Sequence, residues 1–164
     1  MDARIFDTTA RFAMFLRVQY RFHRCIAPLY EQAALHRVLP GMPDRRRLAA
    51  IEQDLADLYI APPCRADERL AGLPLPVALG WLYVAEGSTL GGAVIFRHVS
   101  RLGLHARFGA GHLAPPPEGV APRWRRFTAA LDAVALARDE EPRVDDGACD
   151  AFAAVGRFVA EECA

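Results

Sequence analysis

Three glycines interrupt the most apolar part of the sequence, GWLYVAEGSTLGGAVIFRHVSRLGL. Gly87, Gly91 and Gly92 lie in a pattern that predicts a helix over residues 76–104, although each glycine costs about 1 kcal/mol relative to alanine inside a helix. Gly87 and Gly91 are four residues apart, so they share a face on which bare backbone admits a close neighbour. That neighbour is either a second helix or a flat ligand. Ser88 adds a polar group there, and the bending that glycine allows favours a pocket.

His23 is the histidine placed most centrally on an apolar helical face. The residues of that face recur at spacings of three and four: Phe12, Phe15, Leu16, Gln19, His23 and Ile26. A histidine in such a place is most often a core residue, but a neutral imidazole is also a metal ligand, notably an axial ligand of haem (heme) iron. The other histidines fall near expected helix ends or loops and are expected in solvent: His36, His98, His105 and His112. No H-E-x-x-H motif or carboxylate cluster in the sequence predicts a zinc or di-iron site.

The charges of the chain limit its ligands. All 20 basic residues are arginine and 20 residues are acidic, so the formal net charge is zero, which argues against a general nucleic-acid binder. An anionic ligand must then be held by arginine, histidine or backbone N–H groups. The run Arg45–Arg47 is expected to be a solvated helix start.

The elements that must position these residues are all helical. Helical periodicity predicts five main helices in one domain that covers residues 1–164. Their expected ranges are 7–38 with a kink at Pro28, 44–59, 76–104, 123–138 and 148–162. We find no uncharged apolar stretch of transmembrane length, no secretory signal and no nucleotide-binding motif. A cytoplasmic location is therefore predicted, with Cys25, Cys64, Cys149 and Cys163 as reduced thiols.

The stretch GWLYVAEGSTLGGAVI resembles the distal-helix signature of bacterial biliverdin-producing haem oxygenases, especially the type associated with bacteriophytochromes. The matching positions are Tyr83, Val84, Glu86, Gly87, Ser88, Leu90, Gly91 and Gly92. The family's proximal histidine lies on the first helix, which implies His23 within FLRVQYRFHR as the iron ligand. The segment AFAAVGRFV resembles the last helix of the family, with its phenylalanine at Phe152.

The resemblance implies an all-α, single-domain multi-helix bundle of the haem oxygenase type. Haem is sandwiched there between the first, proximal helix and the glycine-kinked distal helix. The implied haem contacts are His23, Tyr83, Gly87, Gly91, Gly92, Arg125 and Phe152. The implied catalytic positions are Gly87, Ser88 and Gly91, which would confine O2 and hold water. Arg125 is the first candidate to meet a haem propionate, ahead of Arg17, Arg21 and Arg126.

The implied activity is that of an oxidoreductase for which haem is both substrate and cofactor. Haem, O2 and electrons give biliverdin, CO and Fe2+, with the electrons supplied by a separate ferredoxin or reductase and the biliverdin available to a bacteriophytochrome. The sequence departs from the pattern at Gln19, where many members have threonine, and at Ala27, where many have an acid, so the group that orients His23 is left open. Two alternatives are a haem-binding carrier or sensor with degenerate catalysis, and an all-α interaction module.

Overall fold

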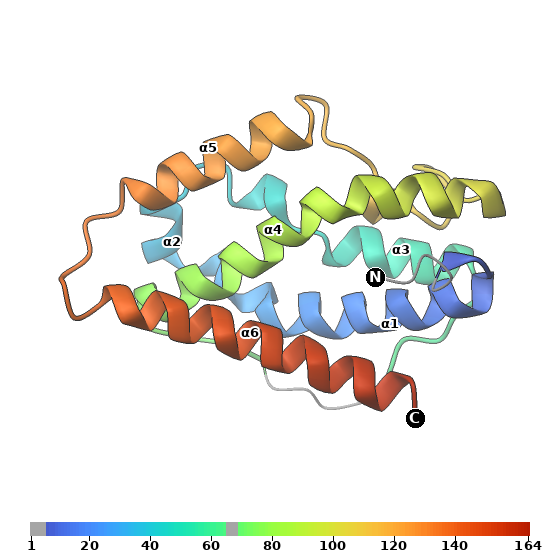
Figure 1. Ribbon diagram of the computed structural model, residues 1–164, viewed down its shortest axis with the longest axis horizontal. Coiled ribbons are helices and arrows are strands. Elements are labelled where there is room, and N and C mark those ends of the chain that lie inside the picture. Colours follow the sequence, from blue (N-terminus) through green and yellow to red (C-terminus); the bar gives the residue numbers. More distant parts are fainter. Residues whose placement is uncertain (1–5, 65–68) are drawn as a thin grey trace.

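The computed structural model describes residues 6–64 and 69–164, and it is all-helical (Figure 1). Its α-helices are α1 (Thr9–Ile26), α2 (Ala33–Val38), α3 (Leu48–Asp57), α4 (Leu75–Val99), α5 (Val120–Asp132) and α6 (Glu141–Glu162). Short 3-10 helices join them: η2 (Ala27–Glu31), η3 (Pro43–Arg45), η4 (Ser100–Leu102) and η5 (Gly111–Leu113). The expected all-α fold is therefore confirmed, although the long first and second segments divide into shorter helices.

The first expected helix ends earlier than predicted because of Pro28. Helix α1 begins after Thr8, whose hydroxyl oxygen accepts a hydrogen bond from the Arg11 backbone N–H at 3.3 Å. It ends at Ile26, and Pro28 lies in the first turn of η2. Proline has no N–H to donate to the preceding turn, so the chain changes to a 3-10 helix at this point instead of continuing with a kink.

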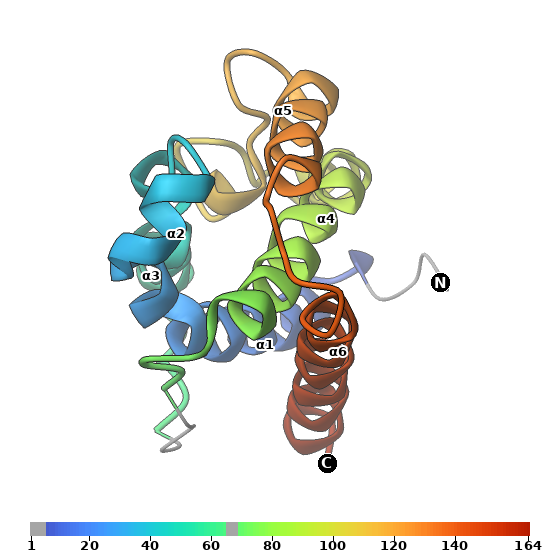
Figure 2. The same cartoon turned by 90° about the vertical axis from the view of Figure 1, so that its left-hand side faces the viewer.

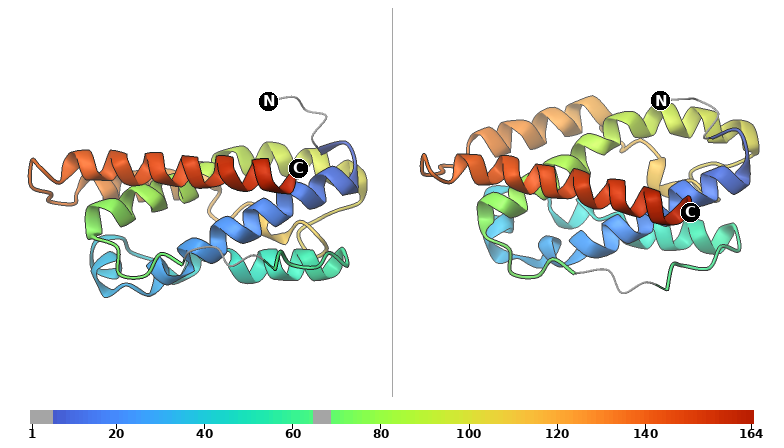
Figure 3. Two further views of the ribbon diagram at one scale, coloured as in Figure 1. Left: turned by 90° about the horizontal axis from the view of Figure 1, so that it is seen from below. Right: turned by 60° about the horizontal axis from the view of Figure 1, so that its bottom comes forward.

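Helices α4 and α6 cross with their backbones in direct contact. A side-chain carbon at Gly80 would overlap the carbonyl oxygen of Val144, and one at Gly147 would overlap the carbonyl oxygen of Val77. Only glycine fits at both positions. Figure 3 shows α6 passing across α4 and α1, so this crossing fixes the last helix on the bundle.

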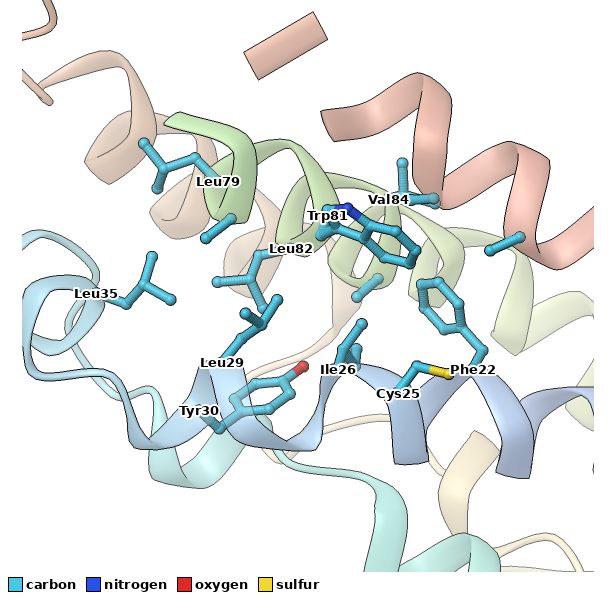
Figure 4. Close-up of a cluster of buried hydrophobic side chains, with 14 of the residues drawn as sticks. Phe22, Cys25, Ile26, Leu29, Tyr30, Leu35, Leu79, Trp81, Leu82 and Val84 are labelled. Atoms are coloured by element: carbon cyan, nitrogen blue, oxygen red, sulfur yellow. The ribbon is translucent and has the colours of Figure 1, made fainter. Parts of the chain in front are cut away.

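The core lies in two clusters along α1 and α4. The first cluster joins α1, η2 and α4, where the rings of Phe22 and Trp81 stack with centroids 6.0 Å apart (Figure 4). The second joins α1, α3 and η5 around Phe12, Ile51 and Leu113. Helix α1 is consequently buried on several sides near its C-terminal end, which is where His23 lies.

Helix α4 is the central apolar helix of the fold. Together with η4, over Leu75–Leu102, it is long and apolar enough to cross a membrane by length and composition, although it carries the charged residues Glu86 and Arg97. Half of its most apolar window is buried, as in the core helix of a bundle. Figure 2 shows α2 and α3 on one side of α4, with α5 above it and α6 below it.

Candidate functional site

One side of α4 presents glycine and exposed apolar residues to solvent. Tyr83, Leu90 and Val94 are 41%, 44% and 47% exposed, and Gly87 and Gly91 lie on the same side of the helix. A side-chain carbon at Gly91 would have no atom of another element within 4 Å. We call these five residues the glycine face, and its apolar surface is uncovered.

Helix α5 borders the glycine face through an aromatic contact. A side-chain carbon at Gly87 would lie 3.6 Å from the ring of Trp124, which is ordinary contact, and the rings of Tyr83 and Trp124 have centroids 5.4 Å apart. On the other neighbouring helix, α6, Phe152 is 64% exposed. Backbone does not approach Gly87 or Gly91 among the described residues, so the tight helix crossing that their spacing also allowed occurs elsewhere, at Gly80.

His23 occupies a different environment from the glycines. Its side chain is buried beside Arg47 and His112, and its Nδ1 has no hydrogen-bond partner among the described residues. Burial lowers the pKa of His23 to about 3, with the positive charge of Arg47 and the nearby His112 adding to the effect. The ring is therefore neutral at pH 7, which is the form that binds metals.

The pocket next to His23 does not include the glycine face. This pocket of about 230 Å³ is lined from α1, η2 and α3, with Ala27, Tyr30 and Arg47 among its walls, and no residue of α4 lines it. On α4, Gly92 is buried and its side-chain position lies 3.6 Å from Leu113, next to His112. Gly91 points about 100° away from Gly92 around the helix. The expectation that His23 and the glycines Gly87 and Gly91 hold one haem between them stays a prediction.

A buried ion pair lies under α4 on the His23 side. Arg45 Nη1 is 2.5 Å from Glu86 Oε2, and the two side chains are only 6% and 3% exposed. Arg123 of α5 approaches the same carboxylate oxygen at 3.9 Å, and the buried hydroxyl of Tyr30 has no partner within the described ranges. The expectation that Arg45 is solvated is wrong, because Glu86 draws it into the interior.

A second buried pair joins α3 to η5. Asp54 Oδ2 lies 2.6 Å from His112 Nδ1, and the same carboxylate accepts hydrogen bonds from the backbone N–H groups of Gly111 at 2.7 Å and His112 at 2.9 Å. Because a carboxylate only accepts, Nδ1 carries the proton and the other ring nitrogen has a lone pair without a partner in the part of the chain that is described. Burial lowers the pKa of His112, against the opposing effect of Asp54. The expectation of a solvated His112 is wrong.

Sequence reasoning missed both pairs for a simple reason. The partners are 41 and 58 residues apart, and no local pattern connects Arg45 with Glu86 or Asp54 with His112. The only available signal was an acidic residue, Asp54 or Glu86, on the apolar side of a predicted helix.

The candidate propionate-binding arginines differ in their partners. Arg17 and Arg21 are paired with Glu162 at 2.7 and 3.2 Å, which ties α1 to the end of α6. Arg126 is paired with Glu118 at 3.2 Å. Arg125 is exposed near the middle of α5 and forms no ion pair with any residue that the structure describes.

Ser88, the remaining predicted site residue, satisfies its hydroxyl locally. Its Oγ donates a hydrogen bond to the carbonyl oxygen of Ala85 at 2.7 Å, and the residue is exposed beside the glycine face. Over residues 6–64 and 69–164, no group of three or more His, Cys, Asp or Glu side chains is arranged to hold a metal ion.

Comparison with known proteins identifies the family of this chain. The sequence model of the family described as Heme oxygenase matches residues 7–161. "Heme oxygenase PigA" of Pseudomonas aeruginosa is 44% identical over 148 residues, which are 90% of this chain and 75% of that protein. The chain belongs to the haem oxygenase family. Among solved structures, the NO- and CO-bound heme oxygenase from Neisseria meningitidis is 35% identical, with a TM-score of 0.89 over 99% of this chain and 81% of that one.

Membership makes this chain a haem-degrading enzyme of the bacterial type, with haem and O2 as its substrates. The described residues fit haem in one respect and not in another. The glycine face offers a flat, apolar surface without obstructing side chains at Gly91, as a planar macrocycle needs. The predicted ligand, His23, lines the separate pocket formed by α1, η2 and α3.

Proposed function

We propose that haem binds over the glycine face of α4, between α5 and α6. The observation that carries this placement is Gly91, which is exposed in mid-helix with open space where a side chain would be. The exposed Leu90 and Val94 beside it would be costly to leave in water, and a planar apolar ligand would cover them. When bound, haem supplies the iron that takes up O2 and the ring that is cleaved.

The chain's own residues would then have distinct roles. Gly87 and Gly91 let the backbone approach the ring closely, and Tyr83 and Phe152 give apolar contacts from α4 and α6. Ser88 would hold water near the reacting edge once its hydroxyl turns from Ala85. Gly92 faces Leu113 on the buried side, so we assign it to packing and not to haem contact.

Arg125 is proposed to bind a haem propionate. A guanidinium pairs well with a carboxylate. Arg17, Arg21 and Arg126 already have carboxylate partners among the described residues, whereas Arg125 has none there. Because the chain has no lysine, an arginine is the only strong cation available for this role.

The role of His23 as iron ligand stays a prediction. Its neutral ring and its unpartnered Nδ1 are properties that a metal ligand needs. The ring lines a pocket whose other walls come from η2 and α3. If haem instead entered the His23 pocket, the macrocycle would have to displace the wall formed by Tyr30 and Arg47.

The proposed products are biliverdin, CO and Fe2+. Electrons would come from a separate ferredoxin or reductase, because the sequence carries no flavin or nucleotide motif of its own. Delivery of biliverdin to a bacteriophytochrome is supported by the resemblance of GWLYVAEGSTLGGAVI to the enzymes associated with those photoreceptors. A cytoplasmic location fits the surface thiols Cys64, Cys149 and Cys163, which are not bridged.

The placement is tested by blocking the glycine face. Haemin should bind the protein with a shifted Soret band, and Gly91→Leu should weaken that binding at least about tenfold by filling the open space above the helix. Ala153→Leu, at an exposed position of α6, is the matched control and should bind haemin normally. Under air with a reductant, the wild type should form biliverdin, seen by its red absorption. Equal haemin affinity in both variants would overturn the placement.

A further inference from the structure

We propose that the outward face of α6 pairs with the same face of a second copy of this chain, with the two helices antiparallel. The inference goes beyond the proposed function and does not depend on where haem binds. The outward face consists of seven exposed, uncharged residues: Cys149, Phe152, Ala153, Gly156, Val159, Ala160 and Cys163. Two of them are large and apolar, since Phe152 is 64% exposed and Val159 is 44% exposed.

This face lies opposite the core side of the same helix, which runs along the lower edge of the bundle in Figure 1. The core side is formed by Gly147, Ala151, Ala154 and Phe158. Gly156 is two residues from both Ala154 and Phe158, which places it about 160° around the helix from each. A surface helix normally turns charged and polar residues away from the core. An uncharged outward face of this length is typical of a surface that a partner covers.

Two charged residues border this face and set the direction of the partner. Asp150 and Arg157 are seven residues apart, so they lie on the same side of α6, and neither forms an ion pair with a residue that the structure describes. When two copies pair about a two-fold axis with their helices antiparallel, this border meets the same border of the partner. Asp150 then comes level with the partner's Arg157, and Arg157 with the partner's Asp150, which gives two attractive pairs.

Other arrangements of the two helices are less favourable. A parallel pair would put the two borders on opposite sides of the interface, so neither charge pair would form. Sliding the antiparallel helices by about two turns would set Asp150 against the partner's Asp150, or Arg157 against the partner's Arg157, and both contacts are repulsive. In the favoured register Glu161 comes level with the partner's Asp146, but Glu161 is already paired with Arg21 at 2.7 Å. Charge complementarity thus selects a second copy in one direction and one register.

The same register suits the shape of the face. Phe152 comes level with a point one residue from the partner's Gly156, where an added side-chain carbon would have nothing within 4 Å. Each Phe152 would therefore pack against bare backbone of the other copy. Phe152 also follows Ala148, whose backbone N atom lies next to the side-chain position of Gly80, by one turn, so it lies between the outward face and α4. A haem contact from the α4 side is therefore compatible with the dimer.

The first test is sedimentation velocity over a range of protein concentrations, with and without haemin. The face is smaller than the about 20–30 residues per side of a standard interface, so we expect a reversible dimer that increases with concentration. Asp150→Arg and Arg157→Asp should each weaken the dimer at least about tenfold, because each places like charges together twice. Combining both substitutions restores opposite charges and should restore the dimer. Asp132→Arg makes the same charge change at an exposed position of α5 and should dimerise like the wild type.

The second test reads the direction of the helices from two native thiols. Cys149 and Cys163 are exposed and lie about 21 Å apart along one helix, so a short thiol crosslinker cannot join them within one chain. In the proposed register each Cys149 lies about 8 Å along the helix axis from the partner's Cys163. Mass spectrometry of the crosslinked dimer should therefore find Cys149 joined to Cys163. The proposal is overturned by a chain that stays monomeric up to about 1 mM, by a dimer that the single charge changes do not weaken, or by crosslinks that join only Cys149 to Cys149.

Discussion

Gly80 of α4 and Gly147 of α6 meet backbone to backbone, and neither position has space for a side-chain carbon. The helix that carries the proposed haem surface, α4, is therefore held against α6 at a point where both helices lack a side chain. This contact lies seven residues before Gly87, so the same helix uses glycine for packing at one point and for an open surface at another. The two uses make opposite predictions for substitution by alanine.

At the crossing, alanine should destabilise the fold. Gly80→Ala and Gly147→Ala each force two helix backbones apart, and overpacking of this kind costs about 1–3 kcal/mol or more in free energy of unfolding. Gly156→Ala on α6 is the matched control, because nothing lies within 4 Å of the added carbon and the change should stabilise the helix by up to about 1 kcal/mol. Urea denaturation followed by circular dichroism measures the three values. Equal stability of all three variants would contradict the close crossing.

Stability should fall as the pH is lowered because of His23. Burial lowers its pKa to about 3 in the folded protein, whereas an unfolded histidine titrates near its ordinary value of 6.5. Between these values the unfolded state binds more protons, so the neutral ring's contribution is present above pH 6.5 and is lost as the pH falls toward 3. The slope is up to about 1.4 kcal/mol per pH unit for one such group. His112, with its pKa lowered too, adds to the slope in the same direction.

The measurement is the urea midpoint between pH 5 and 6.5, above the range in which ordinary carboxylates titrate. His23→Gln removes one titrating group, so its unfolding free energy should depend less steeply on pH than that of the wild type. His36→Gln, at an exposed position, is the control and should keep the wild-type slope. An identical slope in His23→Gln would show that His23 is not held in its neutral form by burial.

The buried pair of Arg45 and Glu86 should behave as one unit. Arg45→Met leaves the carboxylate of Glu86 buried with only Arg123 nearby at 3.9 Å, and breaking a buried pair typically costs about 3–5 kcal/mol. The double variant Arg45→Met with Glu86→Leu should recover much of this loss, because no uncompensated charge remains between them. Thermal and urea unfolding of both single variants and the double variant give the coupling energy. Strict additivity of the single effects would mean that the pair is not coupled.

The sequence predicts the helices well and the site only in part, and the reason is the range of the interactions. Apolar periodicity is local, so α4 was found near its true position and the signature around Gly87 was recognised, whereas α6 begins at Glu141, seven residues before its expected start. The end of α1 at Ile26 was missed by the expected continuation to residue 38, although Pro28 gave a local signal. Helical spacing also showed that Gly87 and Gly91 share a face.

Which neighbour that face meets is not a local property. It depends on how α4 is rotated against α1, α5 and α6, and this rotation is set by contacts such as the one between Gly80 and Gly147. The prediction that His23 and the glycines share one haem site assumed that the core-facing sides of α1 and α4 face each other. In the structure, Glu86 and Gly92 face the interior, whereas Gly87 lies against Trp124 and Gly91 faces open space.

Alanine substitutions on α4 should separate haem contact from packing. Gly91→Ala adds a methyl group to open space, so the fold should be retained while haem oxidation slows, since the group would lie between the helix and the ring. Gly92→Ala adds its methyl group against Leu113 at ordinary contact distance and should leave turnover close to wild type. Initial rates of biliverdin formation, normalised to bound haem, make the comparison. Near-normal rates in both Gly87→Ala and Gly91→Ala would rule out a steric role for the glycine face.

Arg125 offers the last test, because the chain supplies a matched neighbour. Arg125→Ala should weaken haemin binding by about three- to tenfold, corresponding to the loss of an exposed to half-exposed ion pair, and should alter the distribution of biliverdin isomers if the ring rotates in its site. Arg126→Ala removes a guanidinium one position along α5 that is already paired with Glu118 at 3.2 Å, so it should change neither quantity. Haemin titration gives the affinities, and chromatography of the product gives the isomers. Indistinguishable behaviour of the two variants would mean that Arg125 is a solvated residue near the middle of α5, and that the propionates are held by backbone N–H groups or by water.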